Sequence, residues 1–244
     1  MSSLLKETVK SLFAANDAAY KLLFRAYFWS GKRLPIDRVP AGDGQGGTTF
    51  TSIYRNNGWG SLESRSGAGS TLASTANIRR ELPGLVERLN IRTLLDAPCG
   101  DFNWMKEVAL PAGCTYIGAD IVPDIIKDVA ARFGSPSRSF ICADILDSLP
   151  DADLWLRRDC LIHLSNEQIA TVIENFRRSN IRYWLTTHVP ACRINKNIPT
   201  GAYHLVNLRR PPFNLPKPLA VIDDFAPLGH PKQLALWSRE QLTR

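Results

Sequence analysis

Short apolar runs of strand length alternate with segments of helical periodicity along most of the chain. The runs cover residues 91–96, 115–120, 139–143, 153–157, 182–187, 219–223 and 233–237. Strands that are apolar along their whole length are typical of a parallel sheet whose two faces are both covered by helices. The pattern therefore predicts an α/β fold.

Three further segments have apolar residues at spacings of three and four, which predicts helices. They are residues 70–89, 124–133 and 166–179. The third has the clearest start, because Ser165 and Gln168 have the spacing of a capping box ahead of Ile169. The second and third of these helices each connect two consecutive strands, as parallel pairing requires.

The first part of the chain has a different pattern. Residues 3–29 carry apolar residues at helical spacing, and residues 1–33 contain six Lys or Arg against two acids. Residues 35–47 are rich in Pro, Gly and Asp, which indicates a linker. We therefore predict a helical extension in residues 1–47 and one domain in residues 48–244. A basic amphipathic helix can contact a membrane surface, but we favour packing on its own domain or on a partner.

The composition limits the classes of protein that remain. The 244 residues are 44% hydrophobic and 22% charged, which suits one sizeable core but not two full enzyme domains. The net charge of +7 permits an acidic partner, but the lack of a long basic run argues against nucleic acid. No stretch has the apolar length needed to span a bilayer, and no signal peptide is predicted.

Cysteines and acids give no sign of a metal site. The five cysteines stand singly, without a CxxC pair, and their odd number argues against a closed disulfide framework. A reducing, cytoplasmic compartment is therefore predicted. Asp223 and Asp224 are adjacent, but they lack His or further acids at metal-ligand spacing, so we interpret them as a strand-end turn.

Four consecutive strands end in an aspartate. Asp96, Asp120, Asp144 and Asp159 follow the first four apolar runs. Ligands of open parallel sheets bind outside the carboxyl ends of the strands, so we expect these carboxylates at one edge. A carboxylate accepts hydrogen bonds from a ribose diol or an adenine amino group, which predicts a nucleoside site. Helix capping and turn formation are the alternative explanation.

The turn after the first strand, "DAPCGDF", narrows the choice of nucleoside. It contains neither GxGxxG nor GxxxxGK[ST], the glycine-rich patterns that bind phosphate through backbone amides. Gly100 lets the backbone approach a ligand closely. Acids stand where a phosphate would require amides and Lys, so the turn favours a cofactor that is itself cationic.

Four motifs of the chain, taken in order, resemble those of a known family. "DAPCGDFNW", "YIGADI", "ICADIL" and "RRDCLIHLS" resemble the successive motifs of class I S-adenosylmethionine-dependent methyltransferases, and the resemblance covers roughly residues 48–240. "NNGWGSLESRSGAGST" and "NIPTGAYHLVNLRRPPFNLPKP" are similar to bacterial nodulation-type sugar O-methyltransferases, which methylate fucose on lipo-chitooligosaccharides. The resemblance implies a Rossmann-like, seven-stranded, mostly parallel sheet with helices on both faces. One departure is that the family's first motif has more glycines.

The resemblance also implies a role for each motif. Asp96 and Gly100 would shape the loop under the methionine portion of S-adenosylmethionine, Asp120 would bind the ribose, and Asp144 would lie near the adenine. Asp159 would face the sulfonium or the acceptor. The other implied cofactor-binding residues are Ser66, Gly67, Gly69, Ser70, Ala97, Pro98, Asp101, Trp104, Ile121 and Ile145. The stretch at residues 66–70 suits the methionine carboxylate, or it is simply a loop that ends in a helix cap.

Methyl transfer to a hydroxyl needs a general base within hydrogen-bond reach. His163 is the first candidate because the pKa of histidine lies near neutrality, and Asp159 would orient it or act itself. His188 is the rival base. Trp59 and Tyr203 would offer apolar platforms to a small-molecule or glycan acceptor. A purely structural role is the alternative for His163, and core packing is the alternative for Trp104.

Four other functions stay open. A methyltransferase could act on another small molecule, such as a phenol or a carboxylic acid. A nucleic-acid methyltransferase would carry a [DN]-P-P-[YF] loop after the fourth strand, where this chain has "RDCLIH". A nicotinamide-dependent enzyme would need the missing glycines. A non-catalytic subunit would bind the cofactor without turnover. The oligomeric state is not predicted.

Overall fold

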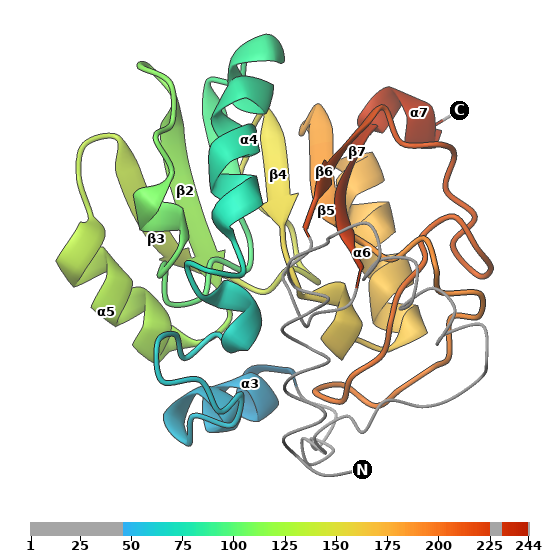
Figure 1. Cartoon of the computed structure of the whole chain (residues 1–244), viewed down its shortest axis with the longest axis horizontal. Helices are drawn as coiled ribbons and strands as arrows, with labels where there is room; N and C mark the ends of the chain where they lie inside the picture. Colours follow the sequence, from blue (N-terminus) through green and yellow to red (C-terminus); the bar gives the residue numbers. More distant parts are fainter. Residues whose placement is uncertain (1–45, 225–230, 244) are drawn as a thin grey trace, which may run out of the picture.

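All seven apolar runs form strands of one sheet in the computed structural model, which describes residues 46–224 and 231–243 (Figure 1). The spatial order is β3-β2-β1-β4-β5-β7-β6. Strands β1 to β5 pair in parallel, and β7 runs antiparallel to both β5 and β6. The strands are β1 (Thr93–Asp96), β2 (Thr115–Asp120), β3 (Arg138–Cys142), β4 (Leu154–Arg157), β5 (Tyr183–His188), β6 (Ala220–Asp223) and β7 (Gln233–Ser238). The α/β prediction is confirmed, and each strand lies within two residues of its predicted bounds.

Helices cover both faces of this sheet. The main ones are α4 (Ala76–Arg88), α5 (Pro123–Phe133) and α6 (Asn166–Arg178), with the short α7 (Arg239–Thr243) at the end. One hydrophobic core lies under α4 and α5, and a second lies under α6 and residues 206–215. The capping box predicted at Ser165 and Gln168 is present at the start of α6. The predicted Rossmann-like architecture is therefore confirmed.

Helix α4 begins later than its apolar periodicity predicts. The prediction was residue 70, whereas regular α-helix starts at Ala76. The hydroxyls of Thr71 and Ser74 both donate to the carbonyl of Ala68, at 3.0 and 2.9 Å. Such local side-chain bonds offer the backbone an alternative to helical pairing. The segment before α4 therefore forms turns and a short 3-10 helix, η1 (Ala68–Ser70).

One helix was not predicted. Helix α3 (Gly46–Arg55) lies below the carboxyl edge of the sheet in Figure 1 and starts inside the segment assigned to the N-terminal linker. Gly and Thr have low helix propensity, which hides its pattern in the sequence "GGTTFTSIYR". The rest of the predicted N-terminal extension lies outside the described residues, and the division into residues 1–47 and 48–244 stays a prediction.

Three tryptophans stand in register across the middle of the sheet. Trp155 on β4 pairs with Trp184 on β5, which pairs with Trp237 on β7. Neighbouring rings in this row lie 6.1 Å apart. Arg157 is fully buried beside them, with its guanidinium 4.7 Å from the rings of both Trp155 and Trp184. Burial lowers the pKa of Arg157 to about 9. The row forms the rigid centre of the core under α6.

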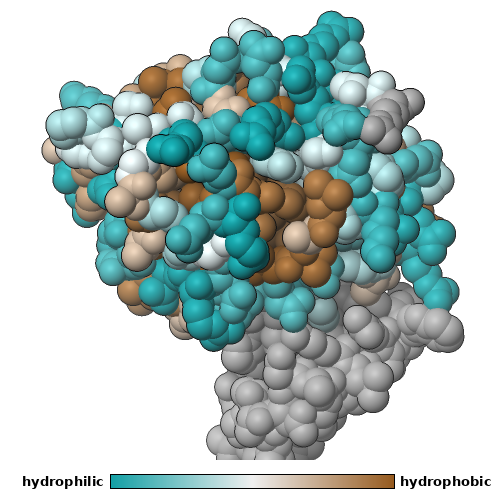
Figure 2. Space-filling model, turned by 90° about the horizontal axis from the view of Figure 1, so that it is seen from above, coloured by the Kyte–Doolittle hydropathy of each residue, from teal (hydrophilic) through white to brown (hydrophobic). Residues whose placement is uncertain are grey.

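The surface of the described residues is largely polar. The large hydrophobic side chains that are most exposed are Leu62, Ile194, Leu219 and Val221. Seen from above, the broadest apolar area lies in a hollow near the centre of the view and is framed by hydrophilic residues (Figure 2). No helix in the described part of the chain is long and apolar enough to cross a membrane.

Candidate active site

A large cavity opens at the carboxyl edge of the parallel strands, around β1 and β4. The order of the strands reverses between β1 and β4, and ligands of open α/β sheets bind at such a point. The empty space at this edge is about 1120 Å³, a volume that includes open solvent at the mouth of the cavity. The predicted site residues that line it are Trp59, Ser66, Ser70, Asp96, Pro98, Gly100, Trp104, Asp120, Ile121, Asp144, Ile145, Asp159 and His163.

The turn after β1 brings the backbone close to the loop before η1. Gly100 has φ of 56°, in the left-handed region that favours glycine. A Cβ at this position would lie 2.2 Å from Oγ of Ser66, so no larger residue fits without moving the loop. The amide of Asp101 donates to the same Ser66 oxygen at 3.0 Å. The predicted need for glycine at residue 100 is thus explained by packing within the protein.

Two buried carboxylates form the floor of the cavity. Asp96 is 2% exposed and accepts a hydrogen bond of 2.8 Å from the hydroxyl of Tyr116. Burial, with a smaller contribution from the nearby Asp120, raises the pKa of Asp96 to about 7, although the hydrogen bond from Tyr116 lowers it. Asp120 accepts from the amides of Gly100 and Val122 at 3.1 and 3.0 Å. Burial raises the pKa of Asp120 to about 6, although these amide bonds lower it.

Asp144 extends this acidic floor beyond β3. Its Oδ1 accepts from the amide of Leu146 at 2.9 Å. Within the described residues, none of Asp96, Asp120 and Asp144 pairs with a basic side chain. The floor of the cavity is therefore acidic. Arg158 lies close enough to lower the pKa of Asp96, but it forms its ion pairs with Asp159 and Asp224.

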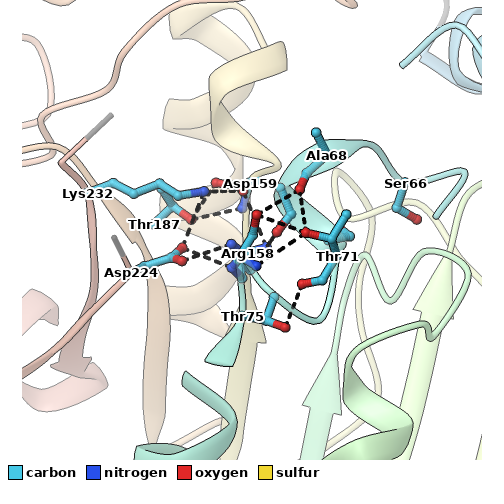
Figure 3. Close-up of polar contacts among 12 residues, drawn as sticks. Ser66, Ala68, Thr71, Thr75, Arg158, Asp159, Thr187, Asp224 and Lys232 are labelled. Atoms are coloured by element: carbon cyan, nitrogen blue, oxygen red, sulfur yellow. Dashed lines mark hydrogen bonds and ion pairs between the residues drawn. The ribbon is translucent and has the colours of Figure 1, made fainter. Parts of the chain in front are cut away.

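Asp159 is in a different electrostatic setting, as Figure 3 shows. Its carboxylate contacts the ammonium of Lys232 and lies 3.4 Å from Nη1 of Arg158. Burial alone would raise the pKa of Asp159, but Lys232 and Arg158 outweigh it and hold the pKa well below the usual range. Asp159 is thus permanently ionised and engaged by two cations, which makes it a poor proton acceptor.

The same network corrects the interpretation of Asp224 as part of a strand-end turn. Asp224 is 1% exposed and accepts two hydrogen bonds from Arg158, at 2.8 and 2.9 Å. Arg158 also donates to the carbonyl of Gly69 at 2.7 Å. These bonds join the end of β4, the end of β6 and the loop of η1 (Figure 3). Gly69 comes so close that a Cβ there would lie 2.8 Å from Asp159 Oδ2.

His163 lies in a short 3-10 helix, η3 (Leu161–His163), on the wall of the cavity. Its Nδ1 is 2.9 Å from the carbonyl oxygen of Ala202. A carbonyl only accepts, so Nδ1 carries the proton and Nε2 keeps its lone pair. The ring packs against Trp59 and Tyr203, with centroids 4.3 and 5.8 Å away. Burial lowers the pKa of His163 to about 4, so the imidazole is neutral at physiological pH.

Comparison with known proteins supports the fold. No protein-family model and no curated protein matches the chain. Magnesium protoporphyrin IX methyltransferase from Synechocystis, solved with bound SAM, is 15% identical with a TM-score of 0.55, over 82% of this chain and 99% of that one. The 1,6-didemethyltoxoflavin-N1-methyltransferase of Burkholderia thailandensis, solved with S-adenosylhomocysteine, is 15% identical with a TM-score of 0.55, over 85% and 97%. The chain has the fold of a class I methyltransferase.

A longer methyltransferase also matches in part. Human N-acetylserotonin methyltransferase, solved with SAM, is 20% identical with a TM-score of 0.46. The match covers 62% of this chain but only 42% of the human enzyme. The chain thus spans less than half the length of that protein.

Some predicted site residues lie outside the cavity. His188 is 2% exposed, packs edge-on against Trp237, and its Nδ1 accepts from the amide of Leu208 at 3.2 Å. The structure therefore does not place His188 where a base would act. Tyr203 does not line the cavity, but its ring packs against His163, which does. Gly67, Gly69 and Ala97 do not line the cavity either.

Asp101 has a supporting position. Its carboxylate accepts from the hydroxyls of Ser64 and Ser66, at 2.9 and 3.1 Å, and from the amide of Arg65 at 2.8 Å. It therefore anchors the loop that brings Ser66 to the cavity, and it does not itself line that cavity.

The structure adds cavity residues that the sequence analysis missed. Phe50 and Tyr54 come from α3, where they stand one helical turn apart on the face toward the cavity. Arg65 lies over the ring of Tyr54, 5.3 Å from its centroid. Cys160 and Arg158 also line the cavity. The spacing of Phe50, Ile53 and Tyr54 at three and four residues was a signal in the sequence that could have revealed α3.

Proposed function

We propose that the protein transfers the methyl group of S-adenosylmethionine to a hydroxyl oxygen of a small-molecule or glycan acceptor. The observation that carries this proposal is the presence, in one cavity, of an acidic floor and a neutral histidine. The fold supports it, because solved proteins of the same fold hold SAM or S-adenosylhomocysteine.

The residues present fit this cofactor. S-adenosylmethionine is a nucleoside with a positively charged sulfur, and it supplies an electrophilic methyl group. Asp96, Asp120 and Asp144 form an acidic floor, and none of the three makes an ion pair with a described basic side chain, which suits a cation. Asp120 would accept from the ribose hydroxyls and Asp144 would lie near the adenine edge. Ser66 and Ser70 would bind the methionine portion.

His163 is our choice for the general base. A hydroxyl becomes a good nucleophile only as its proton leaves, which calls for an acceptor within hydrogen-bond reach. Nε2 of His163 is that acceptor, because Nδ1 donates to Ala202. The charge of Asp159 favours the protonated ring, so it stabilises the imidazolium that forms during transfer. In this mechanism Asp159 assists His163 and takes no proton itself.

For the acceptor, we propose a sugar hydroxyl, such as the 2-O of fucose on a lipo-chitooligosaccharide. The support is the resemblance of "NNGWGSLESRSGAGST" and the segment after β5 to nodulation-type sugar O-methyltransferases. Trp59 flanks His163 and lines the cavity. Its ring offers an apolar face for the sugar next to the base.

Two measurements test the proposal in order. Calorimetric titration should show binding of S-adenosylmethionine and S-adenosylhomocysteine but not of NAD. Transfer of a labelled methyl group should then occur to fucosylated chitooligosaccharides and not to the same oligosaccharides without fucose. Binding of NAD alone would refute the cofactor. Cofactor binding with transfer only to non-sugar acceptors would keep the methyltransferase and refute the sugar.

A further inference from the structure

The segment between β5 and β6 is strongly basic. Residues 189–218 contain Arg193, Lys196, Arg209, Arg210 and Lys217 and no Asp or Glu. The segment appears in orange at the right of Figure 1, beside α6. Thirty residues without an acid, in a chain that carries 23 acids, concentrate positive charge on this part of the molecule.

The folding of this segment sorts its apolar and basic side chains. Val206, Leu208 and Leu215 are buried in the core under α6. Its five basic residues are all exposed. Lys196, Arg209 and Arg210 form no ion pair with another described residue. The positive charge is therefore presented to the surroundings.

Two asparagines bring the basic turns together. The side-chain amide of Asn195 donates to the carbonyls of Asn207, Arg210 and Pro211, at 2.9, 3.3 and 2.8 Å. The amide of Asn207 donates back to Asn195 Oδ1 at 2.8 Å. Asn195 and Asn207 are 8% and 4% exposed, so this pairing is internal and fixed. It holds the turn at residues 193–196 against the turn at residues 209–211.

We call the exposed residues Arg193, Ile194, Lys196, Arg209 and Arg210 the basic face. Ile194 is 72% exposed and is flanked by basic residues of the same turn. We propose that the basic face docks on an anionic lipid surface, with Ile194 entering the interface. Basic residues near such a surface contribute about 1 kcal/mol each, and an apolar side chain adds burial.

A lipid surface suits the basic face better than nucleic acid does. Proteins that bind single strands stack bases on aromatic side chains. The aromatic residues of this segment are unsuited to that role, because Phe213 and His204 are 9% and 7% exposed and Tyr203 packs on His163. Ile194, the side chain that projects among the Arg and Lys residues, is aliphatic, as expected for contact with a bilayer.

The full chain should co-sediment with phosphatidylglycerol vesicles at low salt and not with phosphatidylcholine vesicles. The double variant Arg209→Ser/Arg210→Ser should bind phosphatidylglycerol about 30-fold more weakly, which is two contributions of about 1 kcal/mol each. Ile194→Asp should also weaken binding. These side chains are exposed, so thermal unfolding should confirm that each variant folds like the wild type.

A matched control is available on the opposite face. Arg88→Ser/Arg92→Ser removes the same charge from exposed residues at the end of α4 and before β1, and it should change binding by less than about twofold. Residues 1–45 are identical in all variants, so their own basic residues cannot produce a difference.

Equal loss in both double variants, or binding to phosphatidylcholine, would overturn the proposal. Tighter binding to an oligonucleotide that depends on Arg209 and Arg210 would assign the face to nucleic acid. No cofactor is used, so these results do not depend on the methyltransferase proposal.

Discussion

Nδ1 of His163 donates to the carbonyl oxygen of Ala202 across 2.9 Å, and this contact leaves Nε2 as the nitrogen with a lone pair. We expect His163→Gln to lower the rate of methyl transfer by about 10² to 10⁴, the usual contribution of a general base. Affinity for S-adenosylmethionine should change less than about threefold, because the floor carboxylates are untouched. Steady-state kinetics and calorimetry on the same preparation check both statements.

His188→Gln is the matched control. His188 accepts from the amide of Leu208, and a glutamine oxygen can replace that acceptor, so we expect a near wild-type rate. A large loss in this variant together with a wild-type rate in His163→Gln would reverse the assignment of the base.

Asp120→Asn should weaken binding of S-adenosylmethionine about 10- to 100-fold. A hydrogen bond to a charged acceptor is worth about 1.5–3 kcal/mol, and the substitution removes the charge. The unfolding temperature should change little, since the asparagine oxygen still accepts from one of the two backbone amides. An equal loss of stability and affinity would show that Asp120 serves the fold and not the ligand.

The two floor carboxylates make affinity depend on pH. Asp96 and Asp120 have pKa values of about 7 and about 6, both raised by burial. A sulfonium beside them favours the ionised forms, so its binding releases protons near pH 6–7, and affinity for S-adenosylmethionine rises with pH through that window. S-adenosylhomocysteine has a neutral sulfur, so its affinity should respond less. Titration in two buffers with different ionisation enthalpies measures the released protons. Equal proton release with both ligands would contradict the role of the floor.

Without ligand, the same carboxyls have the opposite effect on the fold. Their folded pKa values lie above the unfolded values near 3.9, so the folded state binds more protons between them. Their contribution to stability is complete below about pH 4 and is lost as pH rises through about 6 and then 7. Urea unfolding of Asp96→Asn should therefore show a smaller decline of stability between pH 5 and pH 8 than the wild type.

Arg158→Met should destabilise the protein by about 3–5 kcal/mol. The substitution removes the bidentate partner of Asp224, which is 1% exposed, and leaves this carboxylate with the single contact to Lys232 at 3.3 Å. Breaking a buried ion pair by removing one partner is costly. The double variant Arg158→Met/Asp224→Leu should recover part of the loss, because neither charge then remains alone. Urea unfolding measures both. A double variant as unstable as the sum of the single variants would mean that the two residues act independently.

The strands and their terminal acids were predictable because both are local properties of the sequence. The first four apolar runs are followed by Asp96, Asp120, Asp144 and Asp159. Because these strands are parallel, their carboxyl ends meet at one edge of the sheet, which brings the four aspartates together. The pairing of Arg158 with Asp224 was not predictable, since it joins residues 66 positions apart. Helix α3 was missed for another reason. Its glycines and threonines disfavour a helix in isolation, and contact with the rest of the fold stabilises it.

The choice between the two candidate bases also depends on contacts that the sequence does not show. His163 comes six residues after β4 and His188 is the last residue of β5, and the sequence ranked His163 first without a contact that separates the two. Only the backbone of the segment at residues 201–208 distinguishes them, because Ala202 accepts from His163 while Leu208 donates to His188. Tertiary contacts therefore leave the lone pair of His163 Nε2 available and occupy the lone pair of His188 Nδ1.

The tryptophan row across β4, β5 and β7 and the tryptophans of the cavity give the protein two separate fluorescence signals. Trp155, Trp184 and Trp237 are at most 1% exposed, so their fluorescence reports the integrity of the sheet and shifts only when the core takes up water. Trp59 and Trp104 line the cavity, so their emission responds to what binds there. Ligand occupancy and unfolding can therefore be followed in one unlabelled sample, at two emission wavelengths.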